Sequence, residues 1–290
     1  MTRPVLDFVI IGGQRCGSTW MASTLEQHPD IVMGAPKELH YFNRFVLRHD
    51  LGWYRSHFDD GGRGDHVLTG EATPAYGSLD RAPVEALREA LPDLRLVLIV
   101  RNPMDRTWSH LCSRFGPGPN RPPESFVLRR ALYQLHRRTT RDHNDFVATI
   151  EVWGSAFGRD RLHLVSFDDL VRDEQRALRE LTRFIGVADH AFDLERGRRF
   201  GAHLVAMPPE VRWHMQRALA DVVRAQAAAL GPKAADWRVP LEPVEVLPGW
   251  MRRYRTYAAV GRAERLATQP RFRRRQTALA RAIRQAFARD

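Results

Sequence analysis

Continuous apolar runs alternate with amphipathic stretches along most of the chain. Residues 5–11 and 94–103 are rich in valine, isoleucine and leucine, and such runs are typical of strands that are buried on both faces of a parallel sheet. Two further strands are predicted within residues 66–76 and 161–170. These four segments supply the apolar layer around which we expect the chain to fold.

Amphipathic spacing predicts helices between and after these strands, over residues 18–27, 103–115, 173–186 and about 208–230. Pro103 suits the first turn of a helix, and Gly186 is typical of a helix carboxyl end. Residues 116–123, which read GPGPNRPP, are predicted to form a loop. Strands that alternate with helices of this length indicate an α/β fold with a central parallel sheet flanked by helices.

The tail differs in composition from the rest of the chain, because arginine, alanine and other helix formers dominate it from about residue 250. We therefore expect one domain over residues 1–245 and an Arg-rich helical extension over residues 246–290. We favour a solvated helix over a patch that binds a membrane surface or nucleic acid. A cover over an active site and a subunit contact are further alternatives.

Positive charge in this chain is almost entirely arginine. The net charge of its 290 residues is +11, and Lys37 and Lys233 are the only lysines, a skew that suggests a GC-rich bacterial genome. Cys16 and Cys112 are too few for a disulfide framework and lack metal-ligand spacing, so we expect no metal site and a reducing, cytoplasmic setting. No apolar run reaches membrane-spanning length or has the pattern of a secretory signal.

The first motif, FVIIGGQRCGSTW, lies between a predicted strand and a predicted helix. A helix amino terminus favours an anion through its unpaired amides and its dipole, and Arg15 adds a full positive charge. The glycine spacing is close to that of a Walker A loop, but the lysine of that motif is absent, and GxGxxG does not fit either. The alternative is an ordinary strand-to-helix turn that uses glycine for its geometry.

A second motif, LVLIVRNPMDRTWSHLCSRF, follows the strand at residues 94–103. It places Arg101 just beyond the carboxyl end of the strand and Ser109 two turns into the next helix. Ligands of open α/β sheets bind at that edge, so these two residues are candidates for a second phosphate site. The alternatives are a surface ion pair for Arg101 and a solvated helix position for Ser109.

Together the two motifs resemble the cofactor signatures of sulfotransferases that use 3′-phosphoadenosine 5′-phosphosulfate (PAPS). The segments KELHYFN, LGWYRSHF and GEATPAY are similar to the Golgi, heparan-type branch, and the likeness runs in order over about residues 5–240. The resemblance implies a P-loop-like sulfotransferase fold. It also implies a set of donor-binding residues: Gly13, Gln14, Arg15, Cys16, Gly17, Ser18, Thr19 and Trp20 for the 5′-phosphosulfate, Arg101 and Ser109 for the 3′-phosphate, and Arg198 or Arg199 in a late basic loop.

The resemblance implies that Glu38 is the general base that takes the proton of the acceptor hydroxyl. His40 competes for this role, because a histidine performs it in the cytosolic branch, and a packed core histidine is the alternative. Arg15 replaces the lysine that is usual in the family, and it keeps the positive charge that can donate hydrogen bonds to the leaving group. Lys37 contacts the phosphosulfate, lowers the pKa of Glu38, or faces solvent.

The expected acceptor site contains Lys37, Glu71, Thr73 and Tyr76. Ala72 stands where the heparan-type branch usually has lysine, so the resemblance does not extend to a sulfated polysaccharide acceptor. We expect transfer to a hydroxyl of a small-molecule metabolite, a glycan or a glycolipid, with PAPS as donor and without a metal. The alternatives are a P-loop kinase and a non-catalytic binder that holds nucleic acid or a membrane surface through its basic tail.

Overall fold

The computed structural model describes residues 5–59, 61, 64, 67–116, 127–195, 206–239 and 245–289. It divides into two compact units. The sheet unit comprises Met1–Val100, Phe146–Arg199 and Phe272–Asp290, and the helical unit comprises Arg101–Asp145 and Phe200–Arg271. The long helix α11 (Trp250–Ala288) begins in the helical unit and ends in the sheet unit. Each unit is described separately below.

The sheet unit is built on five parallel strands in the order β2-β3-β1-β4-β5. Their bounds are β1 Phe8–Gly12, β2 Ile31–Met33, β3 Leu68–Ala72, β4 Arg95–Val100 and β5 Leu162–Ser166. All five residues of β1 are buried, as its unbroken apolar sequence predicts for a central strand. Sequence reasoning missed β2, a strand of three residues at the edge of the sheet.

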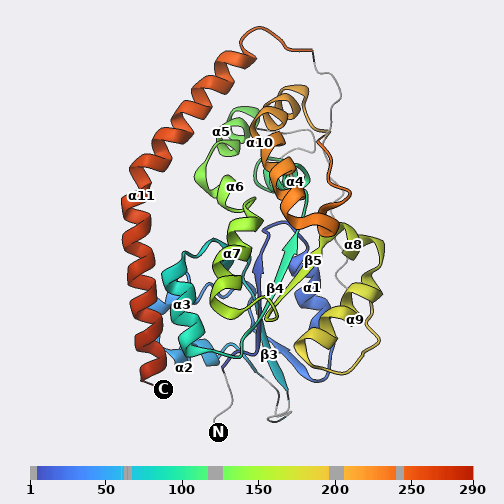
Figure 1. The fold of residues 1–290 in the computed structure, drawn as a ribbon, viewed down its shortest axis with the longest axis vertical. Coiled ribbons are helices and arrows are strands. Elements are labelled where there is room, and N and C mark those ends of the chain that lie inside the picture. The colour runs from blue at the N-terminus through green and yellow to red at the C-terminus, as the bar shows by residue number, and fades with distance from the viewer. Residues whose placement is uncertain are drawn as a thin grey trace. The chain divides into compact units, whose positions relative to one another are not determined.

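Helices flank this sheet, and in Figure 1 α3 and α7 lie on one side of it and α1 and α9 on the other. The predicted parallel α/β sheet is therefore confirmed. The helical elements of the sheet unit are α1 Ser18–Leu25, η1 Phe45–Leu47, α2 Leu51–Arg55, η2 Pro74–Ser78, α3 Arg81–Ala90, α7 Phe146–Phe157, α8 Phe167–Arg172 and α9 Glu174–Ile185.

The strand predicted over residues 161–170 extends too far. β5 ends at Ser166, because the Ser166 side chain accepts a hydrogen bond from the Asp169 amide and starts helix α8. The short strand predicted within residues 66–76 is confirmed: β3 ends at Ala72, and the chain turns into the 3₁₀ helix η2 at Pro74.

The helical unit contains α4 Pro103–Phe115, α5 Leu128–Leu135, α6 Arg138–Asp142, α10 Pro209–Leu230, η3 Gly231–Ala234 and the first part of α11. Most of the predicted loop at residues 116–123 lies outside the described residues. No helix within the described ranges is long and apolar enough to cross a membrane.

The carboxyl-terminal part of α11 belongs to the core of the sheet unit. Leu279, Ala280 and Ile283 are buried there, and the Gln276 side chain accepts a hydrogen bond from the Asp80 amide. Arg284 adds a two-fold hydrogen bond to Glu89. The prediction that the tail is helical is confirmed, but the expectation of a solvated helix is wrong for this part.

Candidate functional site

The loop between β1 and α1 is held in a tight conformation that glycine makes possible. Gly13 and Gly17 have φ angles of 69° and 92°, in the left-handed region that side chains disfavour. A Cβ atom on Gly13 would lie 2.4 Å from the carbonyl oxygen of Ile99, so the loop also needs glycine for space. Arg15 shares the left-handed conformation, with φ 69°, and its side chain is exposed.

This loop leads directly into the amino terminus of α1. Gly17 is the N-cap residue and has no side chain to accept from the first helical amides, and the first backbone bond of the helix runs from Met21 N–H to the Gly17 carbonyl. The amides of Ser18 and Thr19 therefore stand at the positive end of the helix dipole, where an anion is favoured.

Two of the residues that are predicted to bind PAPS, Cys16 and Trp20, have buried side chains at the glycine loop. The Cys16 side chain is buried, and its backbone N–H donates to the Gly13 carbonyl at 3.0 Å. Trp20 is also buried, and its indole N–H lies 3.5 Å from the Leu194 carbonyl. Gln14 is half-buried in the same turn. Cys16 and Trp20 thus shape the turn with their buried side chains, and the Cys16 amide is already bonded within the loop.

A cluster of three charged or titratable side chains follows β2. Glu38 Oε1 lies 3.4 Å from Lys37 Nζ, and Glu38 Oε2 lies 3.3 Å from His40 Nε2. The Glu38 side chain is 25% exposed, so an acceptor can reach the carboxylate. Burial lowers the pKa of Lys37, the neighbouring Glu38 opposes that shift, and the positive charge of Arg15 adds to it. The predicted catalytic residues and the glycine loop therefore share one electrostatic environment.

Hydrogen bonds and close contacts fix both the backbone and the ring of His40. Its φ angle of 54° is left-handed, and its backbone N–H donates to Thr73 Oγ1 at 3.3 Å. Its ring Nδ1 lies 3.3 Å from Asn43 Oδ1, while Nε2 faces Glu38. Both ring nitrogens thus face a side-chain oxygen, which fixes the orientation of the ring beside Glu38.

Beneath this cluster lies the buried carboxyl group of Glu71, which is 1% exposed. It accepts hydrogen bonds from three hydroxyl groups: Tyr54 at 2.5 Å, Thr73 at 2.5 Å and Tyr76 at 2.8 Å. Burial raises the pKa of Glu71 to about 7, although the three hydrogen bonds pull it down. Because Thr73 also accepts from His40, the Glu71 network supports the backbone at the Glu38–His40 pair.

Glu71, Thr73 and Tyr76, which sequence reasoning assigned to the acceptor, therefore occupy one buried network. Their contact with an acceptor stays a prediction. Tyr54 has no role in the sequence-based assignment, although it lies in the segment LGWYRSHF that carries part of the resemblance. Its hydroxyl meets a carboxyl group 17 residues further along the chain, and no local pattern indicates that pairing.

The second motif begins the helical unit. β4 ends at Val100 and Arg101 follows it directly, half-buried, before Asn102 caps α4 through the Met104 amide. Ser109 is buried on α4, so the alternative of a solvated helix position is wrong. That Arg101 and Ser109 bind the same ligand as the glycine loop stays a prediction. Arg198 and Arg199 lie outside the described residues.

The described part of the chain contains no group of three or more His, Cys, Asp or Glu side chains arranged to hold a metal ion. The charged groups at the site are instead the cations and carboxylates described above. Such a site can bind a polyanion and move a proton at Glu38 or His40.

Comparison with known proteins yields similar sulfotransferases. A family model described as "Sulfotransferase family" matches residues 79–191. The membrane-associated sulfotransferase kil1 of Dictyostelium discoideum is 29% identical over 132 residues, which cover 44% of this chain and 27% of that protein. Human heparan sulfate glucosamine 3-O-sulfotransferase 6 is 27% identical over 181 residues, with 62% and 52% covered.

Among solved structures, a sulfotransferase from Alicyclobacillus acidocaldarius matches with a TM-score of 0.61 and 23% identity. The match covers 79% of this chain and 96% of that protein, and it shows a shared fold. The chain spans between about a quarter and about half of the length of the two curated relatives above.

Proposed function

We propose that this chain, which is similar to sulfotransferases, transfers the sulfuryl group of PAPS to a hydroxyl group of a small-molecule metabolite, a glycan or a glycolipid. One observation carries this proposal: the accessible Glu38 carboxylate lies 3.4 Å from Lys37 and 3.3 Å from His40, in the same unit as the glycine loop that suits an anion. A proton acceptor and an anion cradle in one place are what sulfuryl transfer to a hydroxyl requires.

The donor would bind with its 5′-phosphosulfate on the amides at the start of α1 and beside Arg15. The left-handed glycines support this fit, because they let the loop turn tightly into the amino terminus of α1, where unpaired amides favour an anion. Arg101 and Ser109 would hold the 3′-phosphate, and Arg198 or Arg199 would add charge. An arginine fork binds phosphate oxygens in pairs, which suits a nucleotide that carries phosphate at two positions.

Glu38 would act as the general base. Its carboxylate is accessible, and Lys37 and His40 each hold one of its oxygens, so the group is oriented before the acceptor arrives. As the acceptor oxygen attacks sulfur in line with the departing phosphate, its proton passes to Glu38. Arg15 and Lys37 would stabilise the negative charge that grows on the leaving phosphate.

A transfer assay with radiolabelled PAPS against a panel of metabolites and saccharides tests the activity. We expect Glu38→Gln to lower turnover by about 10²- to 10⁴-fold, the usual contribution of a general base. Binding of 3′-phosphoadenosine 5′-phosphate (PAP), measured by calorimetry, should survive in Glu38→Gln and weaken in Arg101→Ala. Normal turnover in Glu38→Gln together with loss of turnover in His40→Gln would move the base to His40.

Calorimetry with ATP and PAP separates this proposal from the P-loop kinase alternative. The proposed enzyme binds PAP, whereas a kinase binds ATP and not PAP. Titration of the full chain with nucleic acid at several salt concentrations tests the alternative of a binder that uses its basic tail. Such binding would fall steeply with salt and would weaken when Arg273 and Arg274, two exposed arginines of the tail, are both replaced with glutamine.

A further inference from the structure

Two neighbouring hollows in the helical unit share three arginines. The first has a volume of about 320 Å³ and lies among α5, α6, α10 and α11, and the second has a volume of about 440 Å³ and lies between α6 and α11. Arg141, Arg262 and Arg265 line both. They come from parts of the sequence more than a hundred residues apart, so the fold brings their charges together.

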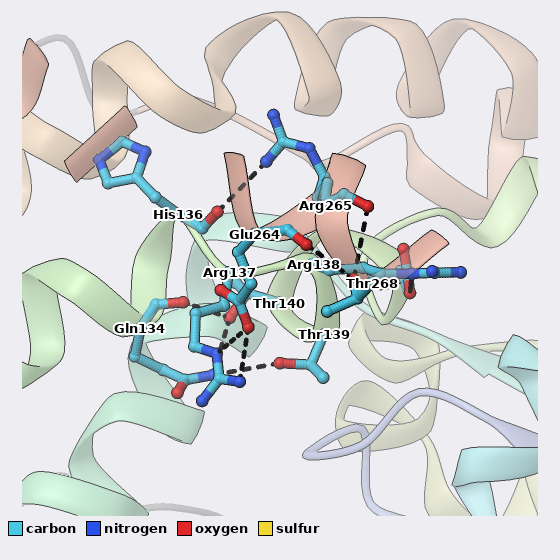
Figure 2. Close-up of polar contacts among 10 residues, drawn as sticks. Gln134, His136, Arg137, Arg138, Thr139, Thr140, Glu264, Arg265 and Thr268 are labelled. Carbon is cyan, nitrogen blue, oxygen red and sulfur yellow. Dashed lines mark hydrogen bonds and ion pairs between the residues drawn. The ribbon is translucent and has the colours of Figure 1, made fainter. Parts of the chain in front are cut away.

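The carboxylates near the hollows are already paired with other arginines. Arg137 donates two hydrogen bonds to Glu264, at 3.1 and 2.7 Å, as Figure 2 shows. Asp142 lines the second hollow itself, and it forms an ion pair with Arg138 at 3.0 Å. These two pairs leave the three shared arginines as the source of the net positive charge.

Within the described ranges, no carboxylate forms an ion pair with Arg141, Arg262 or Arg265. Arg265 instead donates to the backbone carbonyl of His136 at 3.3 Å, which Figure 2 also shows. Burial lowers the pKa of Arg265, and the positive charges of Arg141 and Arg262 lower it further, against the opposing effect of Asp142 and Glu264. The three guanidinium groups therefore repel one another at a place where an anion would relieve the repulsion.

The rest of the first hollow has a different character. Leu135, Leu219 and Val222 give it an apolar wall. His136 also lines it, and its ring packs against Tyr254, with the ring centroids 5.0 Å apart. An apolar wall beside a group of arginines suits a ligand that carries an apolar group next to a charged head.

We propose that these hollows bind a phosphate or sulfate monoester with an apolar organic group. The guanidinium groups of Arg141, Arg262 and Arg265 hold the oxyanion, because their planar forks match its oxygens in pairs. The organic group lies against the apolar wall of the first hollow. This site consists of residues of the helical unit alone and does not depend on the proposed PAPS site.

Calorimetric titration of the full chain with hexyl phosphate and with inorganic phosphate tests the proposal, with PAP present at saturation to fill the donor site. We expect hexyl phosphate to bind at least about tenfold more tightly than inorganic phosphate, because its methylene groups leave water. Arg262→Gln should weaken hexyl phosphate binding by about tenfold or more, the usual effect of losing a charge-assisted hydrogen bond. Arg273→Gln, an exposed change on the same helix that lines neither hollow, should leave the affinity within about twofold of wild type.

Absence of hexyl phosphate binding, or equal weakening in Arg262→Gln and Arg273→Gln, would overturn the proposal. Hexyl phosphate binding that is seen in a parallel titration without PAP, and that disappears with PAP present, would assign the ligand to the donor site and overturn the proposal as well. If circular dichroism shows that Arg262→Gln does not fold, Arg262→Lys takes its place: it keeps the charge, loses the fork, and should still weaken binding measurably, whereas unchanged affinity refutes the site.

The ester can be a free metabolite or a lipid headgroup, and sedimentation with phosphatidylcholine vesicles that contain phosphatidic acid separates these sources. Binding of hexyl phosphate without co-sedimentation supports a free ester. Co-sedimentation of the wild-type protein that is lost in Arg262→Gln supports a lipid headgroup in the same site.

Discussion

Ionisation of Glu71 should make the free energy of unfolding depend on pH, and replacing Glu71 with glutamine should remove most of that dependence. Glu71 is buried under the Glu38–His40 pair, and burial raises its pKa to about 7 from the ordinary value of 4.5. The folded protein therefore binds the Glu71 proton more tightly than the unfolded chain does. This contribution to stability is fully present below pH 4.5 and is lost as the pH rises through 7.

The size of the effect follows from the difference between the two pKa values. Each pH unit corresponds to about 1.4 kcal/mol, so ionised Glu71 lowers the free energy of unfolding by about 3 kcal/mol well above pH 7. Glutamine is neutral at every pH. Its oxygen can accept from Thr73 and Tyr76, as Oε1 of Glu71 does, and its amide group can donate to the hydroxyl of Tyr54. The variant is thus expected to fold with the network intact.

The assay is urea unfolding of the wild type and Glu71→Gln at several pH values between 5 and 8. Over that range we expect the wild type to lose about 2 to 3 kcal/mol relative to the variant. Glu151→Gln makes the same chemical change on an exposed position of α7, and its stability should follow the wild type to within about 0.5 kcal/mol at each pH. A stability difference between wild type and Glu71→Gln that stays constant with pH would refute the raised pKa.

Two further variants test the glycine loop and the end of α11. Gly13→Ala places a Cβ atom 2.4 Å from the Ile99 carbonyl in a left-handed conformation, so we expect a loss of about 2 kcal/mol or more in urea unfolding and weaker PAP binding in calorimetry; unchanged stability would show that the loop relaxes freely. Ile283→Ala should cost about 2 to 5 kcal/mol because Ile283 is fully buried, whereas Leu266→Ala, at a side chain 73% exposed, should stay within about 0.5 kcal/mol of wild type. Equal effects in this pair would contradict the packing of the end of α11.

The central fold was predictable because its strands are buried on both faces. The apolar runs of β1 and β4 carry that signal without interruption, and Pro103 and Gly186 mark helix ends as expected. α7 was missed although its buried residues have helical spacing: Phe146, Ile150, Trp153 and Phe157. β2 is different, because three apolar residues are too few to distinguish a strand from any other buried segment.

The candidate site was predictable where it is local. The turn of the first loop is only a few residues long, and it needs the left-handed conformation that its glycines adopt. Glu38 and His40, which face each other, lie two residues apart in the sequence. The Glu71 network was not predictable, since Tyr54 reaches it only after the chain has folded. The sequence resemblance assigned Glu71 to the acceptor site. In the folded protein the buried carboxyl group accepts hydrogen bonds from three hydroxyl groups, and residue spacing alone does not predict these partners.

Arginine content is a weak guide to anion-binding sites, because the partners of each arginine are set only when the chain has folded. Helix α11 illustrates this. Arg265 and Arg284 are both arginines of a single basic helix. Arg284 meets Glu89 and forms two hydrogen bonds with its carboxylate, so its charge is balanced where it lies. Arg265 meets a backbone carbonyl and two other arginines, and its charge is not balanced by an ion pair within the described residues. What indicates a ligand is thus a place where the fold gathers more cations than carboxylates, because the positive charge that remains attracts an anion.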